Sequence, residues 1–240
     1  MTTYADHRRF RVAVHAQSVA SVHVLWLAAG LALGFLVPYV LTDRLSTPRD
    51  LYYAIYSAFA FGLFAAWAHF TGRSLRALCS RRWPLAVGLG LAFAGVMAFV
   101  VMREPSGPRP DALQLTGALL WRGIVYGFAD GILLSAFPIL VVFAAFAGTR
   151  LRRRMLGTLA VGAAALVASM GMTAAYHAGY SDFRSEKLRK PVVGDVLWSV
   201  PTLVTLNPIG APIAHAGLHI TAVLHDYQTD LFLPPHARPR

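Results

Sequence analysis

Charged residues are scarce in this chain. They make up 14% of its 240 residues, whereas a soluble domain carries about 25%. Hydrophobic residues account for 56%. So few charges argue against a water-soluble globular domain and predict a chain whose largest surface faces lipid. The length suffices for one compact membrane domain with little chain outside it.

Cysteine occurs only once, as Cys79. A single cysteine excludes an intramolecular disulfide and a metal site built from cysteines. Cys79 lies in an arginine-rich segment between two apolar stretches. We interpret it as an inert loop thiol on the cytoplasmic side.

Acidic residues are half as frequent as basic ones, 11 against 22, which gives a formal net charge of +11. Such a balance is typical of nucleic-acid-binding proteins. Here, however, the arginines lie in short runs between apolar segments: HRRFR at 7–11, TGRSLRALCSRR at 71–82 and TRLRRR at 149–154. This is the positive-inside pattern of membrane proteins. We therefore expect the lipid bilayer and its anionic headgroups as partners, and no nucleic acid.

The same arginine runs predict the orientation in the membrane. They favour an integral protein of the plasma (inner) membrane with a cytoplasmic N-terminus. Two crossings return the chain to the cytoplasm at 71–82. The run at 149–154 is also cytoplasmic if the apolar stretch 113–147 crosses the membrane once. The segment SDFRSEKLRKP at 181–191 then falls outside despite its basic residues. The rule therefore leaves the topology of residues 178–240 open.

Apolar runs long enough to cross a membrane recur along the chain, since a spanning helix needs about 20 such residues. Four of these runs are single spans: 22–41, 51–70, 84–102 and 155–177. The last is rich in glycine, alanine and serine and is expected to pack centrally. Several aromatic side chains are expected to form a belt at the membrane interface: Trp26, Trp67, Trp83, Tyr39 and Tyr52.

Two further apolar stretches, 113–147 and 191–225, are too long for one straight crossing. Candidate interruptions are residues 129–131 with Pro138 in the first, and residues 207–210 in the second, since proline removes a backbone donor. Hairpins or long tilted helices are the alternatives. The fold class predicted is all-α: a polytopic membrane helix bundle of six or seven transmembrane helices, one or two of them broken. We divide it into an N-terminal three-helix segment (1–111), a C-terminal core with the polar site (112–227) and a short tail (228–240).

Ionisable side chains within the apolar stretches are the candidates for function. Arg122 and Asp130 are the only formal charges between residues 112 and 149. An ionisable group at membrane depth costs about 2.5–3.5 kcal/mol on insertion scales, so both are expected to face protein or a wet cavity. The alternative is structural, with each one neutralising another buried polar group. Asp195 and Asn207 are also polar residues of the apolar stretches, and Asp195 lies either there or near an interface.

Two histidines, His215 and His219, are spaced i, i+4 in PIAHAGLHITAVLH. On a helix this spacing puts both imidazoles on one face, within reach of one ion or water. His177, at the end of another predicted helix, is the candidate third ligand. The sequence thus predicts a site for a divalent metal such as zinc at His177, His215 and His219. Hydrogen-bonded interior histidines are the alternative.

Three short motifs resemble those of the CAAX-protease and bacteriocin-processing (CPBP) family of intramembrane proteases. That family carries Glu-Glu-x-x-aromatic-Arg-Gly, then Phe-x-x-x-His, then His-x-x-x-Asn on three helices. Here LLWRG at 119–123 resembles the end of the first motif, TAAYH at 173–177 the second, with threonine for phenylalanine, and HAGLH at 215–219 the third, with histidine for asparagine. Order and rough spacing agree over about residues 113–226.

The resemblance implies an intramembrane protease-like core with Arg122, His177, His215 and His219 at its centre. The two glutamates, however, would fall at Gly117 and Ala118, so the carboxylate that serves as general base is missing there. Either the chain is an inactive relative that uses the scaffold for binding, or Asp130, the nearest acid, has taken over that role. In both cases we expect weak or absent proteolysis. A non-enzymatic transporter-like or partner-binding helix bundle is the alternative function.

Overall fold

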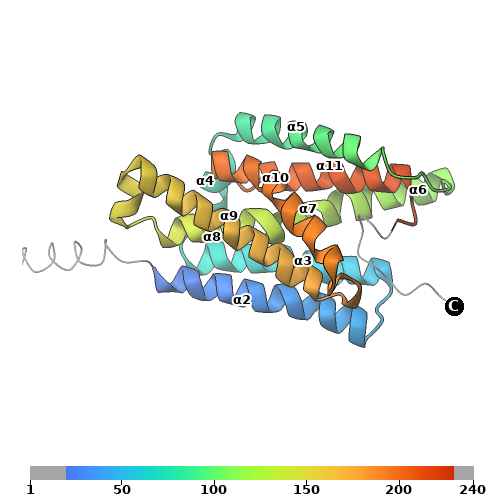
Figure 1. The fold of residues 1–240 in the computed structure, drawn as a ribbon, viewed down its shortest axis with the longest axis horizontal. Coiled ribbons are helices and arrows are strands. Elements are labelled where there is room, and N and C mark those ends of the chain that lie inside the picture. The colour runs from blue at the N-terminus through green and yellow to red at the C-terminus, as the bar shows by residue number, and fades with distance from the viewer. Residues whose placement is uncertain (1–19, 230–240) are drawn as a thin grey trace, which may run out of the picture.

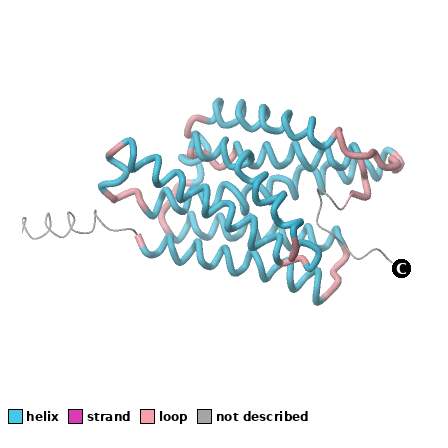
Figure 2. The backbone as a smooth tube through the Cα atoms, viewed as in Figure 1, coloured by secondary structure: helices cyan, strands magenta, loops and turns pink. Residues whose placement is uncertain are grey.

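The computed structural model describes residues 20–229, and over these the chain is helical without strands (Figures 1 and 2). The elements before the long central stretch are α2 (Ser21–Pro38), η1 (Tyr39–Arg44), α3 (Arg49–Phe70), α4 (Leu75–Ser80) and α5 (Trp83–Val101). The central stretch consists of α6 (Ala112–Ala118), η2 (Leu119–Val125), α7 (Tyr126–Asp130), η3 (Gly131–Ala136) and α8 (Phe137–Ala145). The elements after it are η4 (Arg150–Arg153), α9 (Met155–Ala178), η5 (Ser181–Phe183), η6 (Glu186–Leu188), α10 (Arg189–Thr205) and α11 (Gly210–His225).

Five helical stretches among the described residues are long and apolar enough to cross a membrane: Ser21–Arg44, Arg49–Phe70, Trp83–Val101, Ala112–Ala145 and Met155–Ala178. The predicted all-α class is therefore confirmed, with five candidate spans among the described residues where the sequence predicts six or seven transmembrane helices. Helices α10 and α11, with 17 and 16 residues, are shorter than the roughly 20 that a spanning helix needs. They nevertheless pack inside the bundle, and α11 lies along α5 (Figure 1).

The candidate interruption at residues 129–131 is not formed, and the alternative of one long helix is confirmed. The stretch Ala112–Ala145 is helical throughout, and π-helical turns, η2 and η3, take the place of a break. Gly131 keeps right-handed helical angles. Pro138 lies in the first turn of α8 and has no N–H for the carbonyl of Leu134, four residues earlier. That carbonyl accepts a hydrogen bond from Ser169 Oγ at 2.8 Å instead, which compensates for the lost backbone bond.

The second predicted interruption is confirmed, between α10 and α11. Leu206 takes left-handed angles there, with φ at 53°. The side chain of Asn207 secures the turn: its Oδ1 accepts from the Ile209 N–H at 2.8 Å, and its Nδ2 donates to the carbonyls of Cys79 and Arg81 at 2.7 and 2.6 Å. The two short helices are therefore joined by a turn that is bonded to the connection between α4 and α5.

The centre of the bundle is the stretch Ala112–Ala145, 94% of whose most apolar window is buried, against 28% for Met155–Ala178. The stretch 155–177, expected from sequence to pack centrally, lies against α2, α8 and α10 but is less buried than Ala112–Ala145. Two members of the expected interfacial belt also lie inside: Tyr52 and Trp67 are fully buried. Trp67 does so without losing its polar contact, because its Nε1–H donates to His23 Nδ1 at 3.1 Å.

A row of glycines brings the central stretch against α11. Gly123, Gly127 and Gly131 are spaced four residues apart, and a Cβ on each would stand 2.4–2.9 Å from the nearest atom of α11. The opposing residues, Ile220, Ala216 and Pro212, are spaced by four as well. Only residues without a side chain permit this approach, as at other close helix crossings. We call these three positions the glycine seam.

Candidate metal centre

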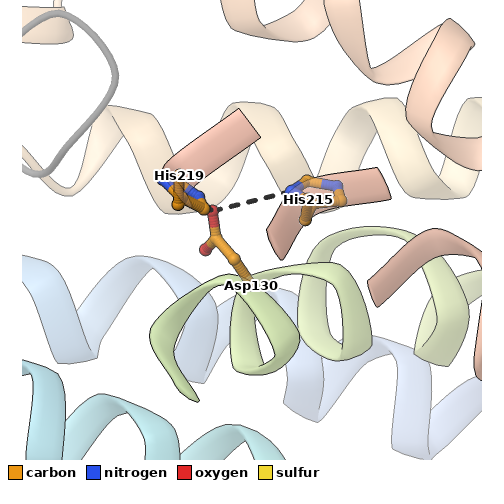
Figure 3. A group of neighbouring side chains, drawn as sticks. All are labelled: Asp130, His215 and His219. Atoms are coloured by element: carbon orange, nitrogen blue, oxygen red, sulfur yellow. Dashed lines mark hydrogen bonds and ion pairs between the residues drawn. The ribbon is translucent and has the colours of Figure 1, made fainter. Parts of the chain in front are cut away.

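Three buried side chains meet where the glycine seam joins the two helices (Figure 3). They are Asp130, the last residue of α7, and His215 and His219 of α11, each at most 5% exposed. Asp130 Oδ2 lies 3.2 Å from His219 Nε2 and 3.8 Å from His215 Nδ1. One ligand atom from each residue lies within 4.8 Å of the others, so the group could hold a metal ion.

The local sequence explains this meeting. The i, i+4 spacing turns both imidazoles of α11 toward the same side, as predicted. Gly127 lies three residues before Asp130, and Gly131 directly follows it. Both glycines let this part of the backbone pack against residues 211–216 of α11. The carboxylate of Asp130 therefore reaches both rings.

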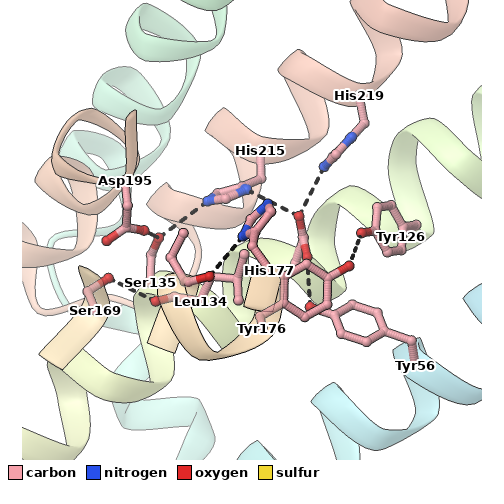
Figure 4. A network of polar contacts seen from close by, with 12 residues as sticks. Tyr56, Tyr126, Leu134, Ser135, Ser169, Tyr176, His177, Asp195, His215 and His219 are labelled. Atoms are coloured by element: carbon pink, nitrogen blue, oxygen red, sulfur yellow. Dashed lines mark hydrogen bonds and ion pairs between the residues drawn. The ribbon is translucent and has the colours of Figure 1, made fainter. Parts of the chain in front are cut away.

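Two members of the group, Asp130 and His215, have a further polar neighbour (Figure 4). Tyr56 OH of α3 donates to Asp130 Oδ1 at 2.7 Å. His215 Nε2 lies 3.3 Å from Ser135 Oγ of η3, and that hydroxyl lies 3.2 Å from Asp195 Oδ1 of α10. Such neighbours fix the orientation of a carboxylate and select the tautomer of an imidazole.

Beside Asp130, phenol groups form a hydrogen-bonded cluster. Tyr176 OH lies 2.5 Å from Tyr126 OH and 2.7 Å from Tyr180 OH, and Tyr52 OH contacts both Tyr176 and Tyr180. All four side chains are buried. The Tyr126 ring also packs at 5.0 Å from the His219 ring. The cluster gives this side of the site a rigid wall with hydrogen-bonding capacity.

His177 is near the group without belonging to it (Figure 4). It lies in the last turn of α9, its Nδ1 lies 2.8 Å from the Thr173 carbonyl, and its ring packs against Phe183. Among the described residues, the cluster with metal-ligand spacing contains Asp130 instead. The set predicted from sequence thus differs at its third member, because the glycine seam brings α7 against the histidine pair of α11.

Arg122 is held by a different partner. Its Nε lies 3.1 Å from Asp50 Oδ1, a second nitrogen lies 3.2 Å from Oδ2, and the guanidinium lies 4.8 Å from the centre of the Tyr227 ring. The side chain is 12% exposed. Arg122 therefore faces a protein group, as expected for a charge within an apolar stretch. The structure does not bring it into the Asp130 group.

Sequence reasoning missed Ser135 and Tyr56 and left Asp195 between two locations. Asp195 is fully buried. Ser135 follows Asp130 by five residues, and the i→i+5 geometry of a π-helical turn brings such residues onto nearby faces, but nothing in the sequence indicates that turn. No local pattern distinguishes Tyr56 from Tyr52 or Tyr53, which lie on the same helix.

A buried carboxylate between two imidazoles can bind a divalent cation or share a proton. Relatives do not narrow this choice: no family model, curated protein or solved structure matches the chain. The candidate site therefore stands on its geometry alone, as a buried Asp/His group inside a membrane-type helical bundle.

Proposed function

We propose that Asp130, His215 and His219 bind a divalent metal such as zinc and form the centre of an intramembrane hydrolase-like core. The observation that carries the proposal is the meeting of their three ligand atoms within 4.8 Å in a fully buried location. Ionisable groups at membrane depth are costly and generally mark a functional site. A bound cation offsets that cost, because it neutralises the buried carboxylate.

The spacing suits zinc. Tetrahedral ligands at about 2.0–2.1 Å from the ion stand about 3.3 Å apart. Asp130 Oδ2 stands 3.2 Å from one imidazole nitrogen and 3.8 Å from the other. Three protein ligands leave a fourth position for water or substrate, which is the arrangement of hydrolytic zinc sites.

The neighbours of the ligands support the same assignment. If His215 Nδ1 holds the metal, its Nε2–H is free to donate to Ser135 Oγ, which donates in turn to Asp195. Metal-binding histidines commonly have a carboxylate or hydroxyl partner of this kind. Tyr56 holds the other oxygen of Asp130 in the same way.

Asp130 also offers a carboxylate where the resemblance to intramembrane proteases lacks one. The glutamate positions of the family motif correspond to Gly117 and Ala118, whereas Asp130 contacts the histidine pair directly. This contact favours Asp130 as the carboxylate of the site, where it acts as a metal ligand and not as the general base. We still expect weak proteolysis, since Arg122 and His177 are bonded elsewhere.

Metal analysis of the purified full-length protein tests the proposal. We expect close to one zinc per chain in the wild type, since one set of three ligands binds one ion, and none in the double variant His215→Ala/His219→Ala. His177→Ala is the matched control, because this nearby histidine is outside the group, and it should keep its zinc. A wild type that binds no divalent metal would refute the proposal, as would equal metal content in the double variant.

A peptide-cleavage assay in detergent tests the chemistry separately. We expect slow hydrolysis that Asp130→Asn abolishes and that zinc removal abolishes reversibly. Robust turnover would contradict the expected weak activity, and turnover that survives in Asp130→Asn would exclude Asp130 from the reaction.

A transporter-like function is the second candidate, and one observation favours it. A continuous row of polar contacts passes through the interior from Asp195 through Ser135, His215 and Asp130 to Tyr56. Such a row can conduct protons or metal ions. Uptake of zinc or protons into proteoliposomes, lost in His215→Ala, would support transport over hydrolysis.

We also propose that the protein lies in the plasma (inner) membrane with its arginine-rich connections in the cytoplasm, where they contact anionic headgroups. Contacts at one end of the bundle support a shared location for these connections. Burial and the nearby charge of Arg81 lower the pKa of Arg152, so the runs at 71–82 and 149–154 lie close together, and Ala20 bonds to Ala145 just before the second run. The run at 7–11 lies outside the described residues.

A further inference from the structure

Asp195 is a second buried carboxylate, and it lacks a basic partner. Its exposed fraction is zero, and the ion pairs among the described residues do not include it. A buried ionised carboxylate without compensation is prohibitively unfavourable. Asp195 therefore needs a proton or a bound cation.

Hydroxyl groups from three elements surround this carboxylate. Ser135 Oγ of η3 lies 3.2 Å from Oδ1, and Ser199 Oγ of α10 lies 3.3 Å from Oδ2. Ser169 and Thr173 of α9 also face the carboxylate. We call these four hydroxyl residues together with Asp195 the Asp195 cluster; Figure 4 shows part of it.

The hydroxyl groups of Ser169 and Ser199 have one hydrogen too few for the close contacts that they make. Ser169 Oγ donates its only hydrogen to the Leu134 carbonyl at 2.8 Å. Its 2.7 Å contact with Ser199 Oγ must therefore use the hydrogen of Ser199. Ser199 then has none left for Asp195, so two acceptor oxygens face each other at 3.3 Å. Positive charge must lie between them.

A second observation points to a ligand rather than to a proton. Thr173 Oγ1 is buried, its residue is 1% exposed, and no partner lies in hydrogen-bonding geometry, although the hydroxyl faces the Asp195 carboxylate. A proton on Asp195 would satisfy only the gap to Ser199, and 3.3 Å is long for an O–H···O bond, which is usually 2.5–3.0 Å. A protonated carboxyl therefore explains neither the distance nor the unpaired threonine.

We propose that the Asp195 cluster binds a monovalent cation of the size of Na⁺, with Asp195, Ser199 and Thr173 as its principal ligands. Oxygens about 2.4 Å from a hard cation and at right angles to each other stand about 3.4 Å apart, close to the 3.3 Å between Ser199 and Asp195. All the side-chain atoms of the cluster that could bind a cation are oxygens, the ligands that hard cations prefer. One carboxylate balances one positive charge, whereas a divalent ion would remain half uncompensated.

The sodium site is distinct from the zinc site but shares Ser135 with it. Ser135 Oγ lies between Asp195 Oδ1 and His215 Nε2. The ligand atoms differ in kind, since the zinc site uses imidazole nitrogens. Sodium binding can therefore be measured on protein that has been stripped of divalent metals, and either proposal can fail without the other.

Direct binding of ²²Na⁺ to the purified full-length protein in detergent tests the proposal. The measurement uses pH 8, EDTA and choline chloride to keep ionic strength constant. We expect saturable binding that unlabelled NaCl displaces and choline does not. Asp195→Asn should abolish it, and Thr173→Val should weaken it about tenfold or more, the scale on which lost metal-site interactions are measured. Ser57→Ala is the matched control, because Ser57 Oγ is also buried and unpaired but lies on α3.

Thermal unfolding provides the second measurement, because a cation that binds only the folded state raises the melting temperature with its concentration. We expect this rise with NaCl in the wild type and in Ser57→Ala, and a clearly smaller rise in Thr173→Val at the same concentration. A wild type that binds no ²²Na⁺ at pH 8 would overturn the proposal in favour of a protonated Asp195. Undiminished binding in Thr173→Val would also overturn it, and this variant decides the question if Asp195→Asn does not fold.

Discussion

At the scale of single residues, Asp130 is defined by what surrounds its two oxygens. Oδ2 faces two imidazole nitrogens, and Oδ1 accepts a hydrogen bond from Tyr56. The histidines and Tyr56 come from different helices, α11 and α3. Asp130 therefore links α3 to α11 in addition to being part of the site. A substitution at one of its partners can affect metal binding, folding or both, so each must be measured.

Replacing Tyr56 by phenylalanine should weaken metal binding. The variant keeps the ring but removes the hydroxyl that orients Asp130. We expect a 10- to 100-fold loss of zinc affinity, the usual effect of removing a hydrogen bond to a metal ligand. Competition with a zinc chelator measures this loss. Tyr39→Phe removes a phenol hydroxyl bonded to Arg44 instead and should leave the affinity unchanged; equal losses in both variants would contradict the role of Tyr56.

Replacing Arg122 by lysine should lower stability but not metal binding. Lysine keeps the charge and loses the two-nitrogen contact with Asp50. We expect a loss of about 1 kcal/mol or less in unfolding free energy, because Asp50 is 60% exposed and solvent screens the pair. Thermal unfolding with zinc analysis of the same samples measures both effects. If zinc is lost while the melting temperature is unchanged, Arg122 belongs to the site as the protease resemblance implies.

The residue-scale predictions from sequence succeeded where spacing along one helix was sufficient. His215 and His219 face the same side because four residues make about one turn. The ligand that joins them could not be derived in this way, because Asp130 reaches them across a helix crossing. Ser135 was missed for a related reason, since its position depends on π-helical geometry that the sequence pattern does not indicate.

At the scale of elements, the glycine seam positions the site. Gly127 faces the backbone of Ala216, next to His215, and Gly131 faces Pro212. From sequence, residues 129–131 together with Pro138 are a candidate break, although glycine in a helix need not break it. Inside a bundle the same residue lets two helices approach closely, and packing then favours a continuous helix.

Substituting alanine for Gly127 should separate the two helices. The added Cβ would lie 2.6 Å from Ala216 Cα, a backbone atom that cannot rotate away. We expect a loss of about 1–3 kcal/mol in stability, typical of overpacking, together with reduced zinc content. Gly117→Ala is the control on the same stretch, because its Cβ would meet nothing within 4 Å. Equal stability of the two variants would show that the seam does not hold the helices together.

At the scale of the whole molecule, the arginine-rich connections lie toward one end of the bundle. Figure 1 shows α4 and the connection between α8 and α9 toward the end where the described part of α2 begins, with the connections after α5 and α9 toward the other. This arrangement agrees with the positive-inside reading of 71–82 and 149–154. It also puts 181–191 at the opposite end, so this basic segment departs from the positive-inside rule.

Cys79 allows the orientation to be measured, because it is the only cysteine and lies in α4, within the arginine-rich connection. Burial raises the pKa of its thiol above the usual value, so the reactive thiolate is scarcer at neutral pH than in an exposed cysteine. Below that pKa, labelling by a maleimide should accelerate about tenfold per pH unit. We expect a membrane-impermeant maleimide at pH 8.5 to label Cys79 only after the inner membrane is permeabilised, with Cys79→Ser as the unlabelled control. Labelling in cells with an intact inner membrane would place the arginine-rich end outside and reverse the proposed orientation.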